Sequence, residues 1–165
     1  MMNKVLIVIG SKNDYNIMKD TTKIFDNFGI KYDIEVASAH RTPERVRTLA
    51  ITAVGKDYDV IIAAASMSAH LAGVISGYTT LPVIGVPIDC PPLNGLDSLL
   101  STVQMPSGVP VATVSIGKAG AKNSALLAIR IMAVYNLELK VKLENFVKQN
   151  EKEIEKIILE KDKCK

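Results

Sequence analysis

The sequence predicts an α/β fold in which helices cover both faces of a five-stranded parallel sheet. Apolar residues make up 48% of the 165-residue chain, but there is no Trp and there are only three Phe and five Tyr. The core must therefore be aliphatic, as in parallel strands that are buried on both faces. Strand-like and helix-like patterns alternate along the chain. The length fits a single domain, 1–165, with a helical extension at 137–165.

The first strand and helix have the clearest local signals. Residues 5–9 form an uninterrupted apolar run, which predicts a central strand buried on both faces. Residues 17–28 carry apolar side chains at helical spacing, and Gly29 is expected to end that helix. Asn13 or Asp14 is expected to cap its start.

The second strand and helix have a different pattern. Residues 32–37 alternate between apolar and polar, which predicts a strand nearer the edge of the sheet. The helix expected at 43–54 begins with Thr42 as its N-cap and a proline at its first position. Gly55 is expected to end it.

The remaining elements repeat this order. Strands are expected at 60–65, 82–86 and 111–115, and helices at 69–76, 96–103 and 117–135. Pro87 is expected to close the fourth strand. The last helix, 137–160, is polar with spaced apolar residues, so we expect it to pack on a neighbouring subunit.

Charge and composition exclude several classes of protein. The chain has 20 Lys plus Arg against 17 Asp plus Glu, and no segment carries one sign alone. We therefore expect neither a nucleic-acid-binding nor a membrane-surface protein. The first apolar run, 5–9, is too short for a signal sequence or a membrane span, which favours a cytoplasmic protein. Cys90 and Cys164 lie far apart and are expected to be free thiols.

Three consecutive strands of the predicted sheet are each followed by a serine. Ser11, Ser38 and Ser66 come next to the starts of helices. Ligands of open α/β sheets bind beyond the carboxyl ends of the strands, and free N–H groups at helix starts attract anions. Arg41 lies close by, and its planar, permanently charged fork suits phosphate. The pattern therefore predicts a phosphorylated small-molecule ligand.

Histidine supplies the strongest candidate for catalysis. His40 is one of two histidines and follows a strand end, where an imidazole can act as a general acid or base near neutral pH. A purely structural role is the alternative. For Ser11 and Asp14 the alternative to ligand binding is capping of a helix. For Ser38 the alternative is a structural role in the turn. We interpret His70 as a packed, hydrogen-bonded histidine.

Other site chemistries lack their sequence signatures. No Cys/His cluster has metal-ligand spacing, and no Gly-x-Gly-x-x-Gly follows the first strand. Lys118 lies between glycines but lacks the spacing of a phosphate-binding P-loop. No Gly-x-Ser-x-Gly nucleophile elbow occurs. We therefore expect no metal and no dinucleotide cofactor.

Four motifs together resemble the PurE family. They are Gly10-Ser11-Lys12-Asn13-Asp14, Ser38-Ala39-His40-Arg41-Thr42-Pro43, Ala69-His70-Leu71-Ala72-Gly73 and Gln104-Met105-Pro106-Ser107-Gly108-Val109-Pro110-Val111-Ala112-Thr113-Val114. The resemblance runs in register from Val5 to about Leu143. It implies a flavodoxin-like three-layer fold, a homo-octamer with sites between subunits and a cofactor-free reaction.

PurE proteins are N5-carboxyaminoimidazole ribonucleotide mutases of purine biosynthesis. The resemblance implies that a carboxylate moves from N5 to C4 of the aminoimidazole ring, with CO2 as a bound intermediate and His40 as the general acid/base. It assigns the ribose and phosphate to Ser11, Asp14, Ser38 and Arg41, with Asp14 on the ribose hydroxyls. It also assigns substrate contacts to Ser66, Ala69, His70 and Leu71.

The loop after the third strand departs from the family pattern. It is usually glycine-rich, but this chain has Ser66, Met67 and Ala72, which affect the pocket that would hold CO2. A related branch carboxylates aminoimidazole ribonucleotide directly with free CO2. Arg41 and the Ala-His-Leu run favour the mutase. A non-catalytic sensor of a phosphoribosyl ligand is a third hypothesis.

Overall fold

The computed structural model describes residues 3–162, and for 158–162 it describes the backbone but not the side chains. These residues form two compact units that divide after Ala128. The first unit contains the sheet and the helices that cover it. The second contains the end of α5 and the long helix α6, and each unit is described by itself.

Five parallel strands form the sheet of the first unit. They are β1 (Lys4–Ile9), β2 (Lys31–Val36), β3 (Val60–Ser66), β4 (Val83–Ile88) and β5 (Ala112–Thr113). Their order is β2-β1-β3-β4-β5, with parallel pairing throughout. This is the flavodoxin-like order, so the predicted fold class is confirmed. The predicted edge position of the second strand is also confirmed.

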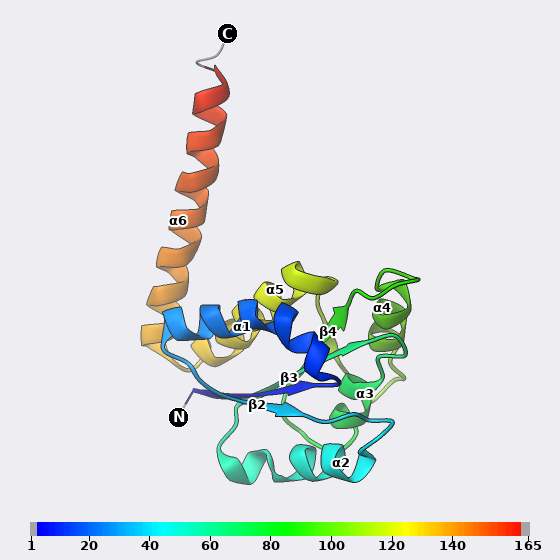
Figure 1. Cartoon of the computed structure of the whole chain (residues 1–165). Helices are drawn as coiled ribbons and strands as arrows, with labels where there is room; N and C mark the ends of the chain where they lie inside the picture. The colour runs from blue at the N-terminus through cyan, green and yellow to red at the C-terminus, as the bar shows by residue number, and fades with distance from the viewer. Residues whose placement is uncertain (1–2, 163–165) are drawn as a thin grey trace. The chain divides into compact units, whose positions relative to one another are not determined.

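Helices cover both faces of the sheet. They are α1 (Tyr15–Phe28), α2 (Pro43–Thr52), α3 (Leu71–Ser76), α4 (Leu96–Val103), α5 (Gly117–Ala133) and α6 (Leu137–Asp162), with short 3-10 turns at Lys12–Asp14 and Val54–Lys56. In Figure 1, α1 and the first turns of α5 lie on one face, and α2 lies on the other with α3. The chain therefore forms the three predicted layers.

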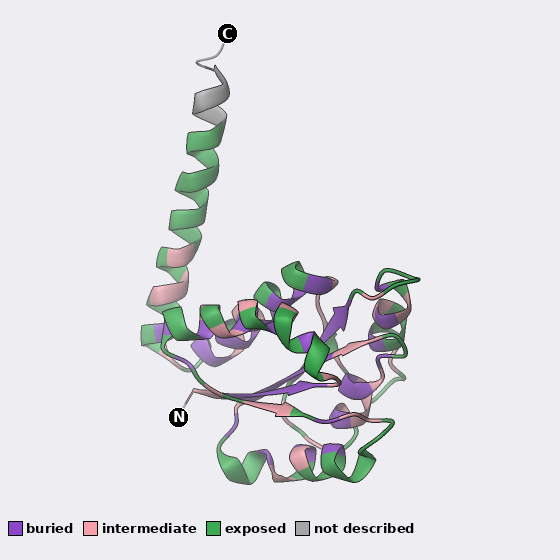
Figure 2. Cartoon of the chain, viewed as in Figure 1, coloured by how far each residue is buried: buried purple, intermediate pink, exposed green. Residues whose placement is uncertain are grey.

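The central strands β1, β3 and β4 supply much of the core, and Figure 2 shows buried residues along the middle of the sheet. Every side chain from Val5 to Ile9 is at most 1% exposed. Leu6 and Val8 pack in one cluster with Val46 and Ala50 of α2. Complete burial of one such aliphatic side chain contributes about 1.5–3 kcal/mol. The uninterrupted apolar run in β1 is thus explained by burial on both faces.

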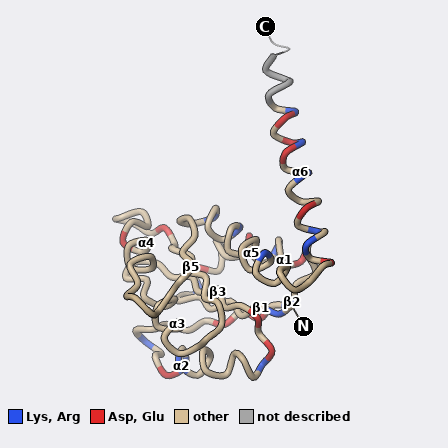
Figure 3. Tube along the Cα trace, turned by 180° about the vertical axis from the view of Figure 1, so that it is seen from behind, with Lys and Arg blue, Asp and Glu red and all other residues tan. Residues whose placement is uncertain are grey.

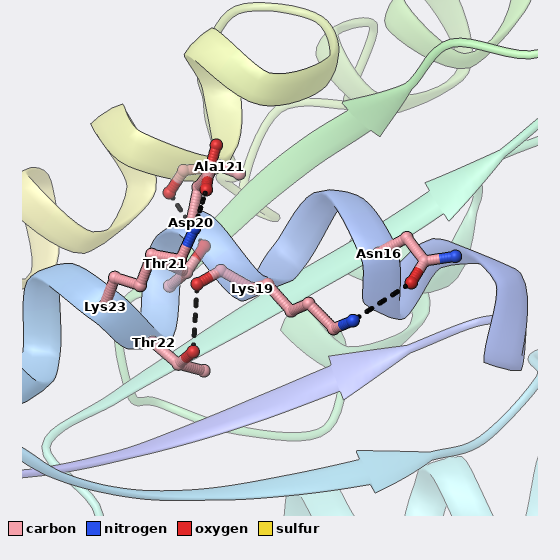
Figure 4. A network of polar contacts seen from close by, with 7 residues as sticks. All are labelled: Asn16, Lys19, Asp20, Thr21, Thr22, Lys23 and Ala121. Carbon is pink, nitrogen blue, oxygen red and sulfur yellow. Dashed lines mark hydrogen bonds and ion pairs between the residues drawn. The ribbon is translucent and has the colours of Figure 1, made fainter.

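A buried hydroxyl joins the two helices on the other face. Thr21 is fully buried in α1, and its Oγ1 donates a 2.8 Å hydrogen bond to the carbonyl of Ala121 in α5 (Figure 4). On the outer side of α1, Lys19 donates to the side chain of Asn16 over 3.3 Å. The bond of Thr21 matters more for stability than that of Lys19, because a buried hydroxyl without a hydrogen-bond partner is costly.

One predicted helix boundary needs correction. The helix after β2 ends at Thr52, and Gly55 does not take the left-handed conformation expected of a stop. Asp57 does so instead, with φ 61°, and its N–H donates to the carbonyl of Val54. Asp tolerates this conformation better than most residues, because its short side chain bonds locally. At the other end, Thr42 occupies the N-cap position but makes no cap bond with its side chain.

The fourth strand extends further than predicted. It continues through Pro87 to Ile88, where Ile88 pairs with Ser66 of β3. β5 pairs only with Ile84 and Gly85, so Pro87 lies beyond that ladder, where no strand N–H is needed. The predicted fifth strand shrinks correspondingly to two residues.

The second unit is dominated by α6, whose residues up to 157 carry both signs of charge (Figure 3). Leu137 is 75% exposed and Ile154 is 59% exposed. Among the described residues, no helix has the length and apolar character needed to cross a membrane. Cys90 is a free thiol, whereas Cys164 lies outside the described residues.

Candidate active site

A cavity of about 600 Å³ lies at the carboxyl edge of the sheet. Its walls come from the segments that follow β1, β2, β3 and β4. These four strands are neighbours, so segments far apart in sequence meet at one edge. This is the edge at which open parallel sheets bind their ligands.

The segment after β1 contributes Ser11 and Asp14. Ser11 Oγ accepts a 3.3 Å hydrogen bond from the backbone N–H of Asn13, so it caps the short 3-10 turn. Asp14 holds the N-cap position of α1, one of the two positions expected to start that helix, but its side chain makes no cap bond. The residue is one of those that line the cavity.

Asp14 is buried without a full set of partners. Only 4% of the residue is exposed, and its Oδ2 has no hydrogen-bond partner. Burial raises the pKa of Asp14 from 3.8 to about 6, and a backbone hydrogen bond at Ser11 acts in the opposite direction. An unsatisfied acceptor that lines a cavity is suited to a hydroxyl group of a ligand.

The segment after β2 is a tight turn that presents two side chains. Ser38 Oγ accepts the backbone N–H of Arg41 at 3.2 Å, and the Ser38 N–H donates to Thr42 Oγ1 at 2.9 Å. His40 and Arg41 are exposed and line the cavity. No ion pair found among the described residues involves Arg41, whose Nη2 makes only a long, 3.5 Å bond to the carbonyl of Gly10. Its fork is therefore available to an anion.

The segment after β3 brings the second histidine to the first. The rings of His40 and His70 have centroids 3.9 Å apart at an interplanar angle of 59°. His70 Nδ1 lies 3.1 Å from the carbonyl of Ser68. A carbonyl only accepts, so Nδ1 carries the hydrogen and Nε2 of a neutral His70 ring is left as an acceptor.

The cavity brings together most residues that the sequence singled out. They are Ser11, Asp14, Ser38, His40, Arg41, Ser66, His70 and Leu71. Ala69 is the exception: it is 2% exposed, does not line the cavity, and its carbonyl accepts from Thr102 Oγ1 at 3.3 Å. The packed-histidine interpretation of His70 is incomplete, because the half-buried ring also lines the cavity against His40.

Sequence reasoning missed the contribution of β4. Ile88, Asp89 and Cys90 line the cavity because the strand extends past Pro87 to this edge. Nothing in the local sequence distinguished this strand end, which has no serine. Met67 also lines the cavity, and its departure from the glycine-rich pattern was the available signal.

Across residues 3–157, whose side chains are described, no group of three or more His, Cys, Asp and Glu side chains is placed to hold a metal ion.

Sequence comparisons identify similar proteins over most of the chain. A family model described as AIR carboxylase matches residues 4–153. A Saccharolobus solfataricus protein named N5-carboxyaminoimidazole ribonucleotide mutase is 54% identical over 145 residues, covering 88% of this chain and 90% of the relative. Proteins of the same name are 50% identical in Bacillus subtilis, covering 87% and 89%, and 46% identical in Escherichia coli K12, covering 92% and 89%.

Structure comparison agrees with the sequence comparisons. The crystal structure of Treponema denticola PurE superposes with a TM-score of 0.82 at 29% identity. The match covers 93% of this chain and 94% of that one. The similarity therefore extends over nearly the whole of both chains.

Proposed function

The chain belongs to the AIR carboxylase family, and we infer that it catalyses the N5-carboxyaminoimidazole ribonucleotide mutase reaction of purine biosynthesis. This makes it an isomerase that acts on a small nucleotide. The observation that carries the inference to particular residues is the cavity itself. It combines an exposed imidazole, a free guanidinium and an unsatisfied carboxylate at the ligand edge of the sheet.

His40 is the proposed general acid/base. In the first half-reaction the bond between N5 and the carboxylate carbon breaks, N5 takes a proton from His40, and CO2 is released within the cavity. In the second, C4 forms a bond to the carbon of CO2 and its proton returns to His40. Protons therefore balance, and the imidazole ends each turnover as it began.

Polar groups around His40 are suited to the rest of the nucleotide. Arg41 has donors free for phosphate, and Ser11 and Ser38 add hydroxyls beside it. Asp14 is suited to ribose hydroxyls, because a carboxylate would repel a phosphate. We propose that His70, whose ring lies against that of His40, contacts the aminoimidazole.

We also propose that the protein acts as a cofactor-free homo-octamer in the cytoplasm. The resemblance to PurE proteins supports the number eight, and exposed apolar side chains support association. Leu96, Leu100 and Val103 share one face of α4 and are 47–55% exposed. On α6, Leu137 and Ile154 are more exposed still, which supports packing of this helix on a neighbouring subunit.

Supplying purified protein with N5-carboxyaminoimidazole ribonucleotide, without added bicarbonate, tests the proposed reaction. Prompt formation of the C4-carboxylated product is expected. Activity seen only with aminoimidazole ribonucleotide plus bicarbonate would contradict the mutase and assign a direct carboxylase. Binding of both nucleotides without turnover would assign a sensor. Sedimentation of a monomer would contradict the proposed assembly.

A further inference from the structure

The turn between β2 and α2 carries both His40 and Arg41, the side chains assigned above to proton transfer and to the phosphate. Both side chains are exposed and line the cavity. An exposed side chain has little packing to fix it, so its position depends mainly on the backbone from which it starts. The bonds that fix the backbone of this turn therefore bear on catalysis as well as on stability.

Thr42 closes the turn through bonds to both backbone groups of Ser38. Its Oγ1 accepts the N–H of Ser38 at 2.9 Å and donates to the carbonyl of Ser38 at 3.1 Å. A hydroxyl has one hydrogen to donate and lone pairs to accept, so the two bonds form together. The same carbonyl also accepts the backbone N–H of Thr42 at 2.8 Å. Three bonds thus join the two residues that enclose His40 and Arg41.

The hydroxyl of Thr42 is bonded to the turn and not to the helix that follows. An N-cap threonine ordinarily accepts the N–H of the second or third helical residue with its side chain. Thr42 occupies the N-cap position of α2 without such a bond, and its carbonyl accepts the N–H of Arg45 at 3.1 Å instead. Thr42 does not line the cavity. Its side chain therefore serves the backbone geometry of the turn.

We propose that Thr42 is a positioning residue, which holds His40 and Arg41 in one geometry toward the bound nucleotide. The proposal rests on the mutase reaction above. Arg41 binds the phosphate while His40 reaches N5 and C4 of the same molecule, so the separation of the two side chains has to match the nucleotide. Misplacing a reacting group by about 1 Å costs up to about 10²-fold in rate. The bonds between Thr42 and Ser38 limit such displacements without touching the substrate.

Steady-state kinetics of Thr42→Val with N5-carboxyaminoimidazole ribonucleotide tests this role. The variant removes the hydroxyl and keeps the β-branched shape. Because one turn places both side chains, we expect kcat to fall and KM to rise, each about fivefold. The combined loss of about 25-fold in kcat/KM corresponds to about 1.9 kcal/mol, within the net contribution of two hydrogen bonds. Thr42→Ser keeps the hydroxyl and should stay within about twofold of the wild type in both parameters.

Thr48→Val is the matched control. Thr48 lies on α2, is exposed and does not line the cavity, and its Oγ1 donates a 2.8 Å bond to the carbonyl of Glu44. Its loss should leave kcat and KM unchanged. Each variant is assayed well below its own unfolding temperature, so that a lower stability alone does not change the rates. Hydrogen exchange measured by mass spectrometry over 37–43 should become faster in Thr42→Val and remain unchanged in Thr48→Val.

The outcomes separate this proposal from the mutase reaction. With an active wild type, unchanged kcat and KM in Thr42→Val would overturn the positioning role. The same conclusion would follow from an equal loss in Thr42→Ser, or from a loss confined to one of the two parameters. A wild type that does not turn over the nucleotide would overturn the mutase reaction itself and the positioning role with it.

Discussion

Replacing Asp14 with Asn is expected to stabilise the folded protein at neutral pH while weakening nucleotide binding. The carboxylate is almost fully buried, and one of its oxygens has no partner. Keeping it ionised in the folded state is therefore costly. The opposed effects on stability and binding would identify a group that is retained for its ligand rather than for the fold.

The magnitude follows from the pKa of Asp14. Burial raises that pKa from 3.8 to about 6, a difference of about 2 pH units or about 3 kcal/mol. Because the pKa of Asp14 is higher in the folded state, its carboxyl contributes fully to the free energy of unfolding below pH 3.8. That contribution is lost as the pH rises through about 6. The Asn side chain does not titrate. Its advantage over the wild type should therefore grow by about 2–3 kcal/mol between pH 4 and pH 7 and then level off.

Urea unfolding at a series of pH values measures this directly. Asp57→Asn serves as the matched control, because it removes one negative charge from an exposed, left-handed position outside the cavity. The free energy of unfolding of Asp57→Asn, plotted against pH, should run parallel to that of the wild type. Calorimetry should show that nucleotide binds Asp14→Asn about 1.5–3 kcal/mol more weakly, the scale of a hydrogen bond to a charged group. A stability difference that does not change between pH 4 and pH 7 would show that burial does not raise the pKa of Asp14 in the folded protein.

Three further predictions concern the phosphate, a helix end and the assembly. Arg41→Lys should raise KM about tenfold with little change in kcat, because Lys lacks the bidentate fork; an unchanged KM would argue against a phosphate contact. Gly29→Ala, at φ 72°, should lower the free energy of unfolding by about 1–2 kcal/mol and leave KM unchanged; unaltered urea midpoints would contradict the helix-end role. Leu100→Asp, on the exposed face of α4, should produce smaller species in sedimentation; an unchanged profile would exclude this face from the interface.

The sequence predicted elements best where local chemistry determines their ends. Gly29 ends α1 in the left-handed conformation expected of it, and α4 begins and ends as predicted. Pairing with distant strands decided the other boundaries. β4 passes through Pro87 because β5 is too short to require its N–H, a fact of sheet pairing that no local pattern contains.

In the site, too, local features could be predicted from the sequence, whereas contacts between distant segments could not. His40 and Arg41 were identified because a strand-to-helix turn at the ligand edge places them by topology alone. The contact of His70 with His40 depends on the left-handed turn at Met67, which the serine and alanine neighbours do not predict. The raised pKa of Asp14 likewise depends on burial by residues far away in sequence.

His40 is proposed to move the protons of the mutase reaction within this cavity. Turnover of N5-carboxyaminoimidazole ribonucleotide by the wild type and by His40→Asn, with binding measured in parallel by calorimetry, tests it most directly. We expect His40→Asn to lose about 10²-fold or more in turnover, the usual contribution of a general acid/base, with nucleotide affinity largely preserved. Turnover by His40→Asn within about threefold of the wild type would contradict it, since that is far below the contribution of such a group.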